Sequence, residues 1–493
     1  MKTFVIVLIG AGTGALACLG EIYDSNFLRY YVPGYVHLLI SCWASWSFFK
    51  QKENYSLFII WTGWFTWFYL QILNPVTGTA ELVELDSYTS ASRLWGVVVA
   101  AVGPSLLYGG VVLWLRPLRS LAKKLQTPLS ARGIDIGYMA AQRWSMLLVA
   151  LIFIVYAVSG GLIVSSVRMI LYMRNTDAGP IFQLDGRLSS IVAFATSALS
   201  LLVLTVFFRK TRYRWIWGAL LPLTAIWSLG LLFCGARSYL IALVVCLGII
   251  IIGRIKVSIL GLSFGACAAV LIIGLAQFAY VTRTSGIKNI DWSEYHDKVF
   301  RLQGLETLAD QTRAFYYYME PASERWFPVH PLAGFVIGIM HRPIECIYFF
   351  VPRSLWTNKP LDPSFTGFTR FSLQLANQDL PFVETFDGKD TGFGTGNTPG
   401  FYGRDVIRYG PLGLLSLTFW FSFMIAIGHI AWRARIYSPF ADWIAACIAG
   451  TIFCMWRGPD PMWLLILMPA AVLLSIGWRK SILASQNTRG VRQ

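Results

Sequence analysis

Apolar stretches alternate with short basic turns along most of the chain, and this pattern is interrupted once. The stretches are about 17–25 residues long, which is the length that an α-helix needs to cross the hydrocarbon core of a bilayer. Between Val281 and Tyr409, charged residues, aromatics and prolines replace them. The pattern predicts an all-α polytopic membrane protein of about twelve transmembrane helices. The spans are expected near residues 4–20, 31–49, 56–74, 94–115, 144–167, 188–208, 215–233, 238–253, 258–280, 410–432, 440–456 and 462–478.

Composition agrees with this interpretation, because 56% hydrophobic and 13% charged residues, with a mean hydropathy of +0.57, exclude a water-soluble globule. Three regions are predicted. An N-terminal membrane bundle of about nine helices covers 1–280, a large loop with short or re-entrant helices covers 281–409, and membrane helices with a basic tail cover 410–493. The first apolar run lacks a cleavage site with small residues, so we expect a retained span rather than a signal peptide.

Within the large loop, residues 331–351 are apolar but contain His341, Arg342, Pro343 and Glu345. Each charge at mid-depth in a bilayer costs about 2.5–3.5 kcal/mol on insertion scales. This segment is therefore expected to be a re-entrant or interfacial helix. His341 and Arg342 are interpreted first as a surface patch on that helix, with a role for His341 in proton transfer as the alternative.

Basic residues decide the orientation, since cytoplasmic loops carry an excess of Lys and Arg. With the N-terminus inside, the cytoplasmic segments hold 21 Lys and Arg, against seven in the short outer loops, while Glu81, Glu84 and Asp86 share one outer loop. Both termini are therefore expected in the cytoplasm, and the large loop outside. The net charge of +16 then reflects this inner-face excess and contact with anionic lipid rather than a nucleic-acid surface.

Ionisable residues at membrane depth would indicate a proton or ion path, and the predicted spans contain few of them. His37 and His429 are the main candidates, with Asp442 near a cytoplasmic end. A lone histidine in a helical bundle more often packs than relays protons, so a proton-coupled transporter is disfavoured. Six of the eight cysteines fall within predicted spans, and no CxxC motif or His/Cys cluster predicts a metal site.

The first candidate for chemistry on the outer face is the turn Cys234-Gly-Ala-Arg-Ser-Tyr239, which joins two predicted spans. It places Arg237 at the membrane interface. The guanidinium either extends to lipid phosphates or is held beside Gly and Ser to bind a phosphate in a bidentate manner. Spacing alone does not decide between these two roles. Arg283, directly after another predicted span, is a further candidate cation.

The second candidate is the stretch Val351-Pro-Arg-Ser-Leu-Trp-Thr-Asn-Lys-Pro360. Its two prolines restrict the backbone around Arg353, Trp356 and Lys359. Cations that hold phosphates beside an aromatic ring that stacks on a pyranose would suit a sugar-phosphate ligand. The alternative is an interfacial loop whose Trp is anchored among lipid headgroups.

The third candidate is the glycine-rich segment 392–413, which precedes the next predicted span. Its glycines allow sharp turns and close approach to a ligand. In a helix, Arg404 and Arg408 would share one face, because they are four residues apart. Asp405 is interpreted either as a proton acceptor or as a salt-bridge partner of these two arginines.

These three segments resemble the O-antigen polymerase family, which is the Wzy type of oligosaccharide repeat-unit polymerase. The resemblance lies in the Gly-Ala-Arg-Ser turn at 235–238, the Pro-Arg-x-x-Trp-x-x-Lys-Pro stretch at 352–360 and the Gly-x-x-Gly…Tyr-Gly-x-x-Gly approach at 400–413. It covers some 35 residues in motif and most of the chain in topology. One departure is that family members often carry Glu where this chain has Arg404. That difference weakens an acidic role carried over to this segment.

The resemblance implies a GT-C-like glycosyltransferase of the bacterial inner membrane, whose large loop is periplasmic. It implies transfer of a growing glycan from undecaprenyl diphosphate to a sugar hydroxyl of a second lipid-linked unit, without metal or other cofactor. A flippase, a chain-length regulator and membrane lipid are the implied partners, and no nucleic acid. The expected diphosphate-binding set is Arg237, Arg353, Lys359, Arg404, Arg408 and Arg283 with Trp356, and the candidate general bases are Asp405 and His341.

Three alternatives stay open. An O-antigen ligase would use the same lipid-linked substrate but transfer the glycan to lipid A core. A non-enzymatic flippase or channel for lipid-linked oligosaccharide would need polar residues along a path through the bundle, and the predicted spans show few. A structural membrane subunit would use its outer loop to bind a partner, which the cations beside Gly and Pro argue against.

Overall fold

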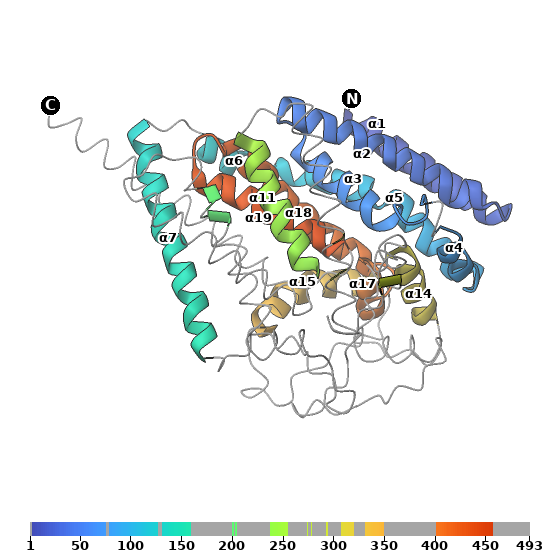
Figure 1. The fold of residues 1–493 in the computed structure, drawn as a ribbon. Coiled ribbons are helices and arrows are strands. Elements are labelled where there is room, and N and C mark those ends of the chain that lie inside the picture. Colours follow the sequence, from blue (N-terminus) through green and yellow to red (C-terminus); the bar gives the residue numbers. More distant parts are fainter. Residues whose placement is uncertain are drawn as a thin grey trace, which may run out of the picture.

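The computed structural model describes residues 2–74, 78–126, 131–158, 200–201, 203–204, 237–254, 274, 278, 292–293, 307–319, 331–349 and 401–456. These parts form helices and turns, and they contain no strand (Figure 1). The described elements are α1 (Lys2–Ile22), the π-helix η1 (Phe27–Tyr31), α2 (Val32–Gln51), α3 (Tyr55–Phe68), α4 (Gly78–Asp86), α5 (Ser90–Leu115), α6 (Arg119–Gln126), α7 (Ala131–Val158), α11 (Arg237–Arg254), α14 (Thr307–Met319), α15 (Pro331–Phe349), α17 (Gly403–Tyr409), α18 (Gly413–Ala434) and α19 (Pro439–Met455).

Several predicted spans coincide with these helices. The helices α1, α2, α5, α11, α18 and α19 begin and end within a few residues of the spans predicted from hydropathy. Among the described residues, three segments are long and apolar enough to cross a membrane: Phe4–Ile22, Ser90–Leu115 and Gly413–Ala434. Two apolar helices are shorter, at Ile241–Arg254 and Pro439–Phe453. The chain is thus an all-α protein with membrane-spanning helices, and the number of twelve stays a prediction.

One helix extends beyond its predicted span, and one predicted boundary was wrong. The helix α7 begins at Ala131, ahead of the span predicted from residue 144, because its polar first half is also helical. The helix α3 ends at Phe68 rather than near residue 74. There, the N–H of Leu70 donates to the carbonyl of Phe65, five residues back, and this wider turn ends the α-helical bonding. The predicted spans 188–208, 215–233, 258–280 and 462–478 lie wholly or almost wholly outside the described residues.

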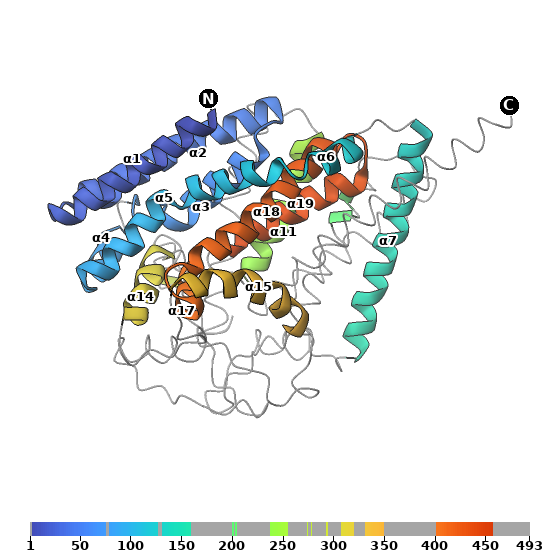
Figure 2. The same ribbon diagram turned by 180° about the vertical axis from the view of Figure 1, so that it is seen from behind.

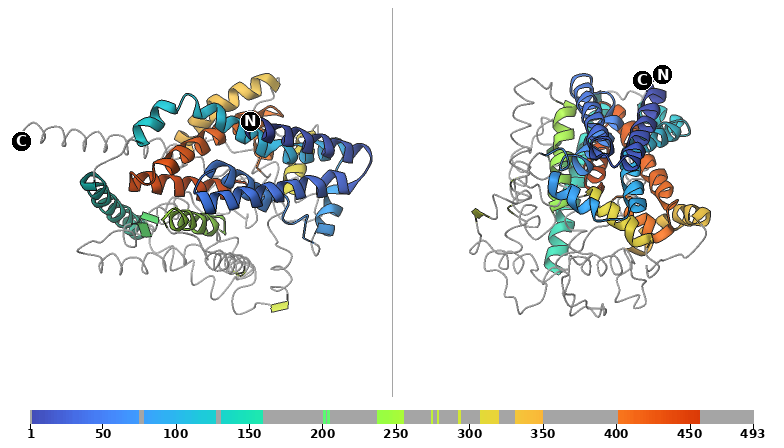
Figure 3. Two further views of the ribbon diagram at one scale, coloured as in Figure 1. Left: turned by 90° about the horizontal axis from the view of Figure 1, so that it is seen from above. Right: turned by 90° about the vertical axis from the view of Figure 1, so that its right-hand side faces the viewer.

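The long helix α5 lies at the centre of the described bundle, in contact with α1, α3, α14 and α18 (Figures 1 and 2). Its contact with α1 depends on small residues. Gly10 faces the side chain of Ser105, whose hydroxyl donates to the carbonyl of Ile6 at 3.0 Å. Small residues let two helix backbones approach closely, which favours helix association in a membrane. On the other side of the bundle, α11 runs alongside α19 (Figure 3).

A proline removes one backbone hydrogen bond from each of two helices, and a tryptophan compensates for each loss. Pro104 in α5 has no N–H to offer the carbonyl of Ala100, four residues earlier, and Trp64 Nε1 donates to that oxygen at 2.9 Å. Pro343 in α15 likewise leaves the carbonyl of Ile339, which accepts from Trp420 Nε1 at 3.2 Å. A carbonyl without a partner is costly inside a bilayer, so each indole replaces a missing backbone bond.

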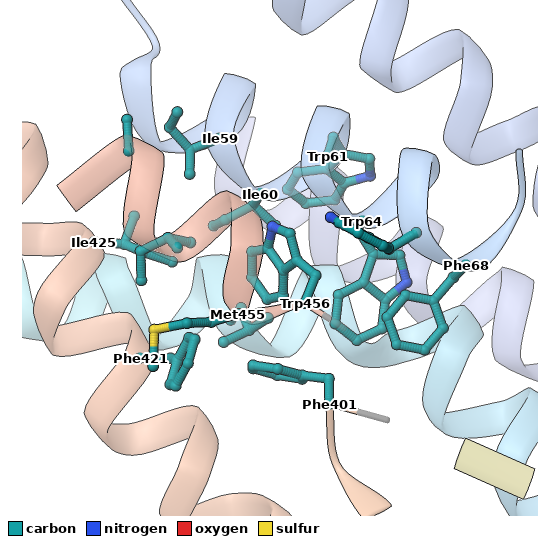
Figure 4. Close-up of a cluster of buried hydrophobic side chains, with 14 of the residues drawn as sticks. Ile59, Ile60, Trp61, Trp64, Phe68, Phe401, Phe421, Ile425, Met455 and Trp456 are labelled. Atoms are coloured by element: carbon teal, nitrogen blue, oxygen red, sulfur yellow. The ribbon is translucent and has the colours of Figure 1, made fainter. Parts of the chain in front are cut away.

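Aromatic rings from distant parts of the sequence form the middle of the core (Figure 4). Trp64 stacks on Phe68 with ring centroids 4.2 Å apart and meets the edge of Trp456 at 5.5 Å. Phe401 contacts Trp456 at 4.8 Å, which joins the segment before α17 to the end of α19. Gly63 makes room for the Trp456 indole, because a Cβ at Gly63 would overlap that ring. This core fixes where α17 lies.

One end of the bundle carries an ion-pair network centred on Arg29, which has no exposed surface. The Arg29 guanidinium contacts Glu21 at 2.8 Å, Asp24 at 2.7 Å and Asp86 at 3.4 Å. Arg93, at the start of α5, also contacts Glu21, at 2.9 Å. These residues come from loops that the sequence assigns to the outer face, and the structure brings them together at one end of α5.

Candidate functional site

Two short segments of the large loop, α15 and α17, pack against each other where α18 begins (Figures 1 and 2). Glycines make this packing possible. Gly334 and Gly338 lie against Tyr409 and Ser416, and a Cβ at Gly334 would overlap the carbonyl oxygen of Tyr409. Gly410 has a φ of +80°, which favours glycine, and it ends α17 so that the chain can turn into α18. The predicted re-entrant or interfacial segment is indeed helical, as α15.

A buried ion pair joins the two segments. Arg342 Nη2 of α15 binds Asp405 Oδ2 of α17, and both side chains are 0% exposed. The interpretation of Arg342 as part of a surface patch was therefore wrong. The expected partners of Asp405 were also wrong, since its ion pair is with Arg342 rather than with the arginines of its own helix. Each charge offsets part of the desolvation cost of the other, and separating them would leave a buried charge unpaired. This pair therefore holds α15 and α17 in one arrangement.

A second polar contact fixes the register between α15 and α17. His341 Nδ1 and the hydroxyl of Tyr409 lie 2.9 Å apart. His341 and Arg342 are adjacent in α15, while Asp405 and Tyr409 are four residues apart and thus share one face of α17. The two contacts therefore lie side by side across a single helix face. His341 is partly exposed whereas Tyr409 is buried, so the tyrosine holds the ring and the imidazole edge is the accessible part.

Arg404 and Arg408 lie on the neighbouring face of α17, and because this segment is helical their spacing places them on one face. Their exposed fractions are 6% and 1%. Among the described residues, α15 and α17 thus bring three guanidinium groups, one imidazole and one carboxylate together. We call His341, Arg342, Arg404, Asp405, Arg408 and Tyr409 the α15–α17 site. Buried guanidinium groups interact strongly with phosphate oxygens, because water does not screen the attraction there.

The surroundings of Asp405 do not suit a general base. Its Oδ2 is occupied by Arg342, and its Oδ1 is buried without a hydrogen-bond partner among the described residues. A base must reach the proton that it removes, within hydrogen-bond distance or through one water. The carboxylate is instead positioned to orient the Arg342 guanidinium. Of the two candidate bases, His341 has the accessible edge.

The helix α14 attaches this site to the outer-loop residues. Arg313 binds Glu84, and its Nε donates to the hydroxyl of Tyr88 at 2.9 Å. Burial lowers the pKa of Arg313, but Asp310, Tyr88 and Glu84 raise it by more, so its net pKa lies above the ordinary value. Burial raises the pKa of Tyr88 to about 12. The network therefore joins the Arg313 guanidinium to the Glu84 carboxyl group and a neutral Tyr88 phenol, and its role is to attach α14 to the loop that contains Glu84 and Tyr88.

Two aromatic residues of α14 are buried. Phe315 and Tyr317 are 1% and 5% exposed. Ala314 and Tyr317 contact Ile407 of α17, and Gln311 Nε2 donates to the carbonyl of Gly96 in α5 at 3.1 Å. The helix thus lies between α5 and α17. The rings of Phe315 and Tyr317 therefore fill space in the core, while Tyr316 and Tyr318 are partly exposed.

The other predicted site residues cannot be placed beside this cluster. Arg283, Arg353, Trp356 and Lys359 lie outside the described residues. Arg237 is the first residue of α11, one residue before the span predicted at 238–253, and nothing is described of its side chain. In the part that the structure describes, no three His, Cys, Asp or Glu side chains are grouped to hold a metal ion. Absence of metal from the site stays a prediction.

Sequence reasoning missed the structural roles of Arg342 and Tyr409. A signal for Arg342 was present, because a charge within an apolar helix needs a partner, and the nearby glycine-rich segment contains a carboxylate. Tyr409 gave no such signal, since aromatics occur throughout the loop. The geometry and chemistry of the α15–α17 site carry the functional argument. No protein-family model matches the chain, and neither a curated protein nor a solved structure matches it.

Proposed function

We propose that the protein is a glycosyltransferase that polymerises undecaprenyl-diphosphate-linked oligosaccharide repeat units at the periplasmic face of a bacterial inner membrane. The single observation that carries this proposal is the α15–α17 site, where Arg342, Arg404 and Arg408 gather at one end of a bundle of apolar helices. A lipid-linked diphosphate has its charged group at such a boundary and its polyprenyl chain in the bilayer. Fixed guanidinium groups suit that ligand better than a neutral one.

The chemistry requires a leaving group and a nucleophile. Undecaprenyl diphosphate leaves from the anomeric carbon of the growing chain, and the hydroxyl of the second unit forms the new glycosidic bond. Arg404 and Arg408 stabilise the negative charge that develops on the leaving diphosphate. His341, held by Tyr409 at 2.9 Å, accepts the proton of the attacking hydroxyl. Asp405 holds Arg342 in place and takes no part in proton transfer.

The predicted orientation agrees with the contacts of α14. This helix belongs to the large loop, and it binds Glu84 and Tyr88, which lie in a loop assigned to the outside from the distribution of basic residues. A large loop on the same face as the outer loops supports a periplasmic site. Arg237, Arg353, Lys359, Arg283 and Trp356 complete the proposed diphosphate-binding set on the basis of their sequence segments alone.

The test uses purified protein in nanodiscs, supplied with undecaprenyl-diphosphate-linked repeat units and no other acceptor. Chains of increasing length should form, because the second unit serves as the acceptor. Arg408→Gln should lower kcat about a hundredfold, as removal of one transition-state donor does. Arg353→Ala should abolish elongation while expression in the membrane stays normal.

The matched control is Arg433→Gln, which removes an exposed arginine near the far end of α18 and should keep wild-type chain lengths. Products that form only after addition of lipid A core would identify a ligase instead. Wild-type rates from a folded Arg408→Gln variant would remove the α15–α17 site from the reaction. Translocation of the lipid-linked unit without any new glycosidic bond would favour a flippase.

A further inference from the structure

Four helix ends meet at the end of the bundle that lies away from the α15–α17 site. They are the C-terminal ends of α2, α11 and α18 and the N-terminal end of α19. Lys52, Arg254 and Arg435 lie there with Asp442, and we call these four residues the Arg435 cluster. Arg254 Nε binds Asp442 Oδ2 at 2.7 Å, and Arg254 Nη2 donates to the carbonyl of Arg435 at 3.3 Å. The cations are thus held together by direct contacts.

Arg435 is the central member of this cluster. Its guanidinium lies over the ring of Trp432, 3.9 Å from the ring centroid, and its Nη1 donates to the Trp432 carbonyl at 2.7 Å. Trp432 Nε1 in turn donates to the carbonyl of Lys52 at 2.7 Å. The side chain is therefore fixed by stacking and by one hydrogen bond. Its Nε is buried without a hydrogen-bond partner among the described residues, and the residue as a whole is partly exposed, so this fixed guanidinium is not fully satisfied by the protein.

Positive charge is concentrated in this cluster. Three cations stand against Asp442, which already binds Arg254. Burial, and then the neighbouring Arg435, lower the pKa of Lys52, while burial lowers the pKa of Arg435. A bound anion would relieve both effects, since an opposite charge favours the charged form of a base. An alternative role for these cations is to cap the carbonyls at helix C-termini. Lys52 Nζ does donate to the carbonyl of Ile252. Capping does not, however, require three cations in one cluster.

The amphipathic helix α6 extends the basic surface. Its apolar residues Leu121 and Leu125 pack with Ile430, Ala434 and Ala441 of the two helices joined at this end (Figure 2). Exposed basic residues at and before this helix are Arg116, Arg119 and Lys123. Because the apolar side of α6 is covered by protein, its basic residues form a rim rather than a membrane anchor. Basic residues just beyond a membrane-spanning helix attract anionic lipid.

We propose that the Arg435 cluster binds the phosphate of an anionic phospholipid headgroup. The position supports a lipid source, because Arg435 directly follows α18, one of the helices long enough to cross a membrane. A headgroup phosphate at that depth would accept from the exposed part of the Arg435 guanidinium, since this residue is partly exposed, while the acyl chains lie along the apolar helices. This site is independent of the proposed transferase reaction and lies at the other end of the bundle.

The test measures binding of phosphatidylglycerol to the full-length protein in detergent, by native mass spectrometry and by thermal stabilisation, with phosphatidylcholine as the zwitterionic comparison. Arg435→Gln should raise the dissociation constant for phosphatidylglycerol about tenfold, as expected for loss of a charged hydrogen bond. Arg433→Gln removes an exposed arginine two residues away, and it should change that constant less than twofold. If Arg435→Gln does not fold, Lys52→Gln replaces it in the test. That variant should raise the dissociation constant for phosphatidylglycerol several-fold.

Three results would overturn the proposal. Equal binding of phosphatidylglycerol and phosphatidylcholine would show that the cluster does not select an anion. Equal losses in Arg433→Gln and Arg435→Gln would show that net charge, rather than this site, attracts the lipid. Equal stabilisation by inorganic phosphate alone would show that the ligand is a soluble anion rather than a phospholipid.

Discussion

Trp420 donates its indole N–H to the carbonyl of Ile339 at 3.2 Å, which is the carbonyl that Pro343 leaves without a backbone partner. The proline follows directly after His341 and Arg342, so the missing backbone hydrogen bond of α15 lies beside the α15–α17 site. The two residues come from different helices, Trp420 from α18 and Pro343 from α15. The indole supplies the hydrogen bond that the proline removes. The bond therefore links the shape of the site to the helix that supports it.

Coupling between Trp420 and Pro343 is the first prediction. Trp420→Phe should lower the free energy of unfolding by about 1–3 kcal/mol, because it leaves the Ile339 carbonyl buried and unbonded. In a Pro343→Ala background the same change should cost less, since an alanine in place of the proline supplies the missing backbone N–H. A double-mutant cycle on thermally or chemically unfolded protein in detergent measures the difference. The pair Trp64 and Pro104 offers a matched cycle, and additive effects in both would contradict this account.

The Arg342–Asp405 pair gives the second prediction. Asp405→Ala leaves a buried guanidinium without its carboxylate and should lower the free energy of unfolding by about 3–5 kcal/mol. The apolar double variant Arg342→Met with Asp405→Leu should recover much of that loss, because no charge is then buried unpaired. Thermal unfolding measures both. A single variant Asp405→Ala as stable as wild type would show that the carboxylate does not compensate Arg342.

Measurements of activity can distinguish a structural role of the Arg342–Asp405 pair from a role in substrate binding. If Arg342 contributes to binding of the substrate, the double variant should fold and yet elongate chains poorly. Chain length on a gel, measured beside the unfolding data, distinguishes loss of stability from loss of function. Wild-type elongation by the double variant would assign the pair a purely structural role.

Close packing at Gly334 gives the third prediction. A Cβ at this position would overlap the carbonyl oxygen of Tyr409, and backbone cannot move aside as a flexible side chain can. Gly334→Ala should therefore separate α15 from α17 and lower the midpoint of thermal unfolding. Gly109→Ala is the control, because a Cβ there meets no atom within 4 Å. That variant should be neutral or more stable by up to about 1 kcal/mol, owing to the higher helix propensity of Ala.

Acid should weaken the Arg29 network, which is the fourth prediction. The hydrogen bond and the charge of Arg29 hold the pKa of Asp24 below its ordinary value of 3.8. A lowered folded pKa contributes stability that is present above the unfolded pKa and is lost as the pH falls through the folded value. The midpoint of unfolding should thus fall on acidification below about pH 4 more in wild type than in Asp24→Asn. The effect is small, because Asp24 is exposed and solvent screens it.

Glu53→Gln is the control for this pH experiment, because it removes an exposed carboxyl that forms no ion pair in the described part of the chain. Its acid-induced loss should match that of the wild type. An Asp24→Asn variant with the wild-type pH dependence would show that other carboxyls account for all of the acid sensitivity.

Hydropathy predicted most of the described helices well. It did not predict helical segments that are polar or very short. The boundaries of α5, α18 and α19 follow from long apolar runs between polar turns. The first half of α7 contains Arg132, Asp135 and Arg143, so a search for apolar windows excluded residues that are nevertheless helical. The helix α17 was not predicted; the sequence indicated only that Arg404 and Arg408 would share a face if this segment were helical. A seven-residue segment has too little pattern to define its own ends.

The sequence by itself determined that the chain is helical and built for a membrane, because the length of an apolar run is a local property set by bilayer thickness. It also identified His341, Arg404, Asp405 and Arg408 as candidates for chemistry. Only the tertiary structure decided the partners: Arg342 with Asp405, His341 with Tyr409, and each indole with the carbonyl freed by a proline. Such pairs depend on which faces of helices far apart in the chain pack together. That packing is set by close approach at glycines and by the aromatic core, and no local pattern encodes it.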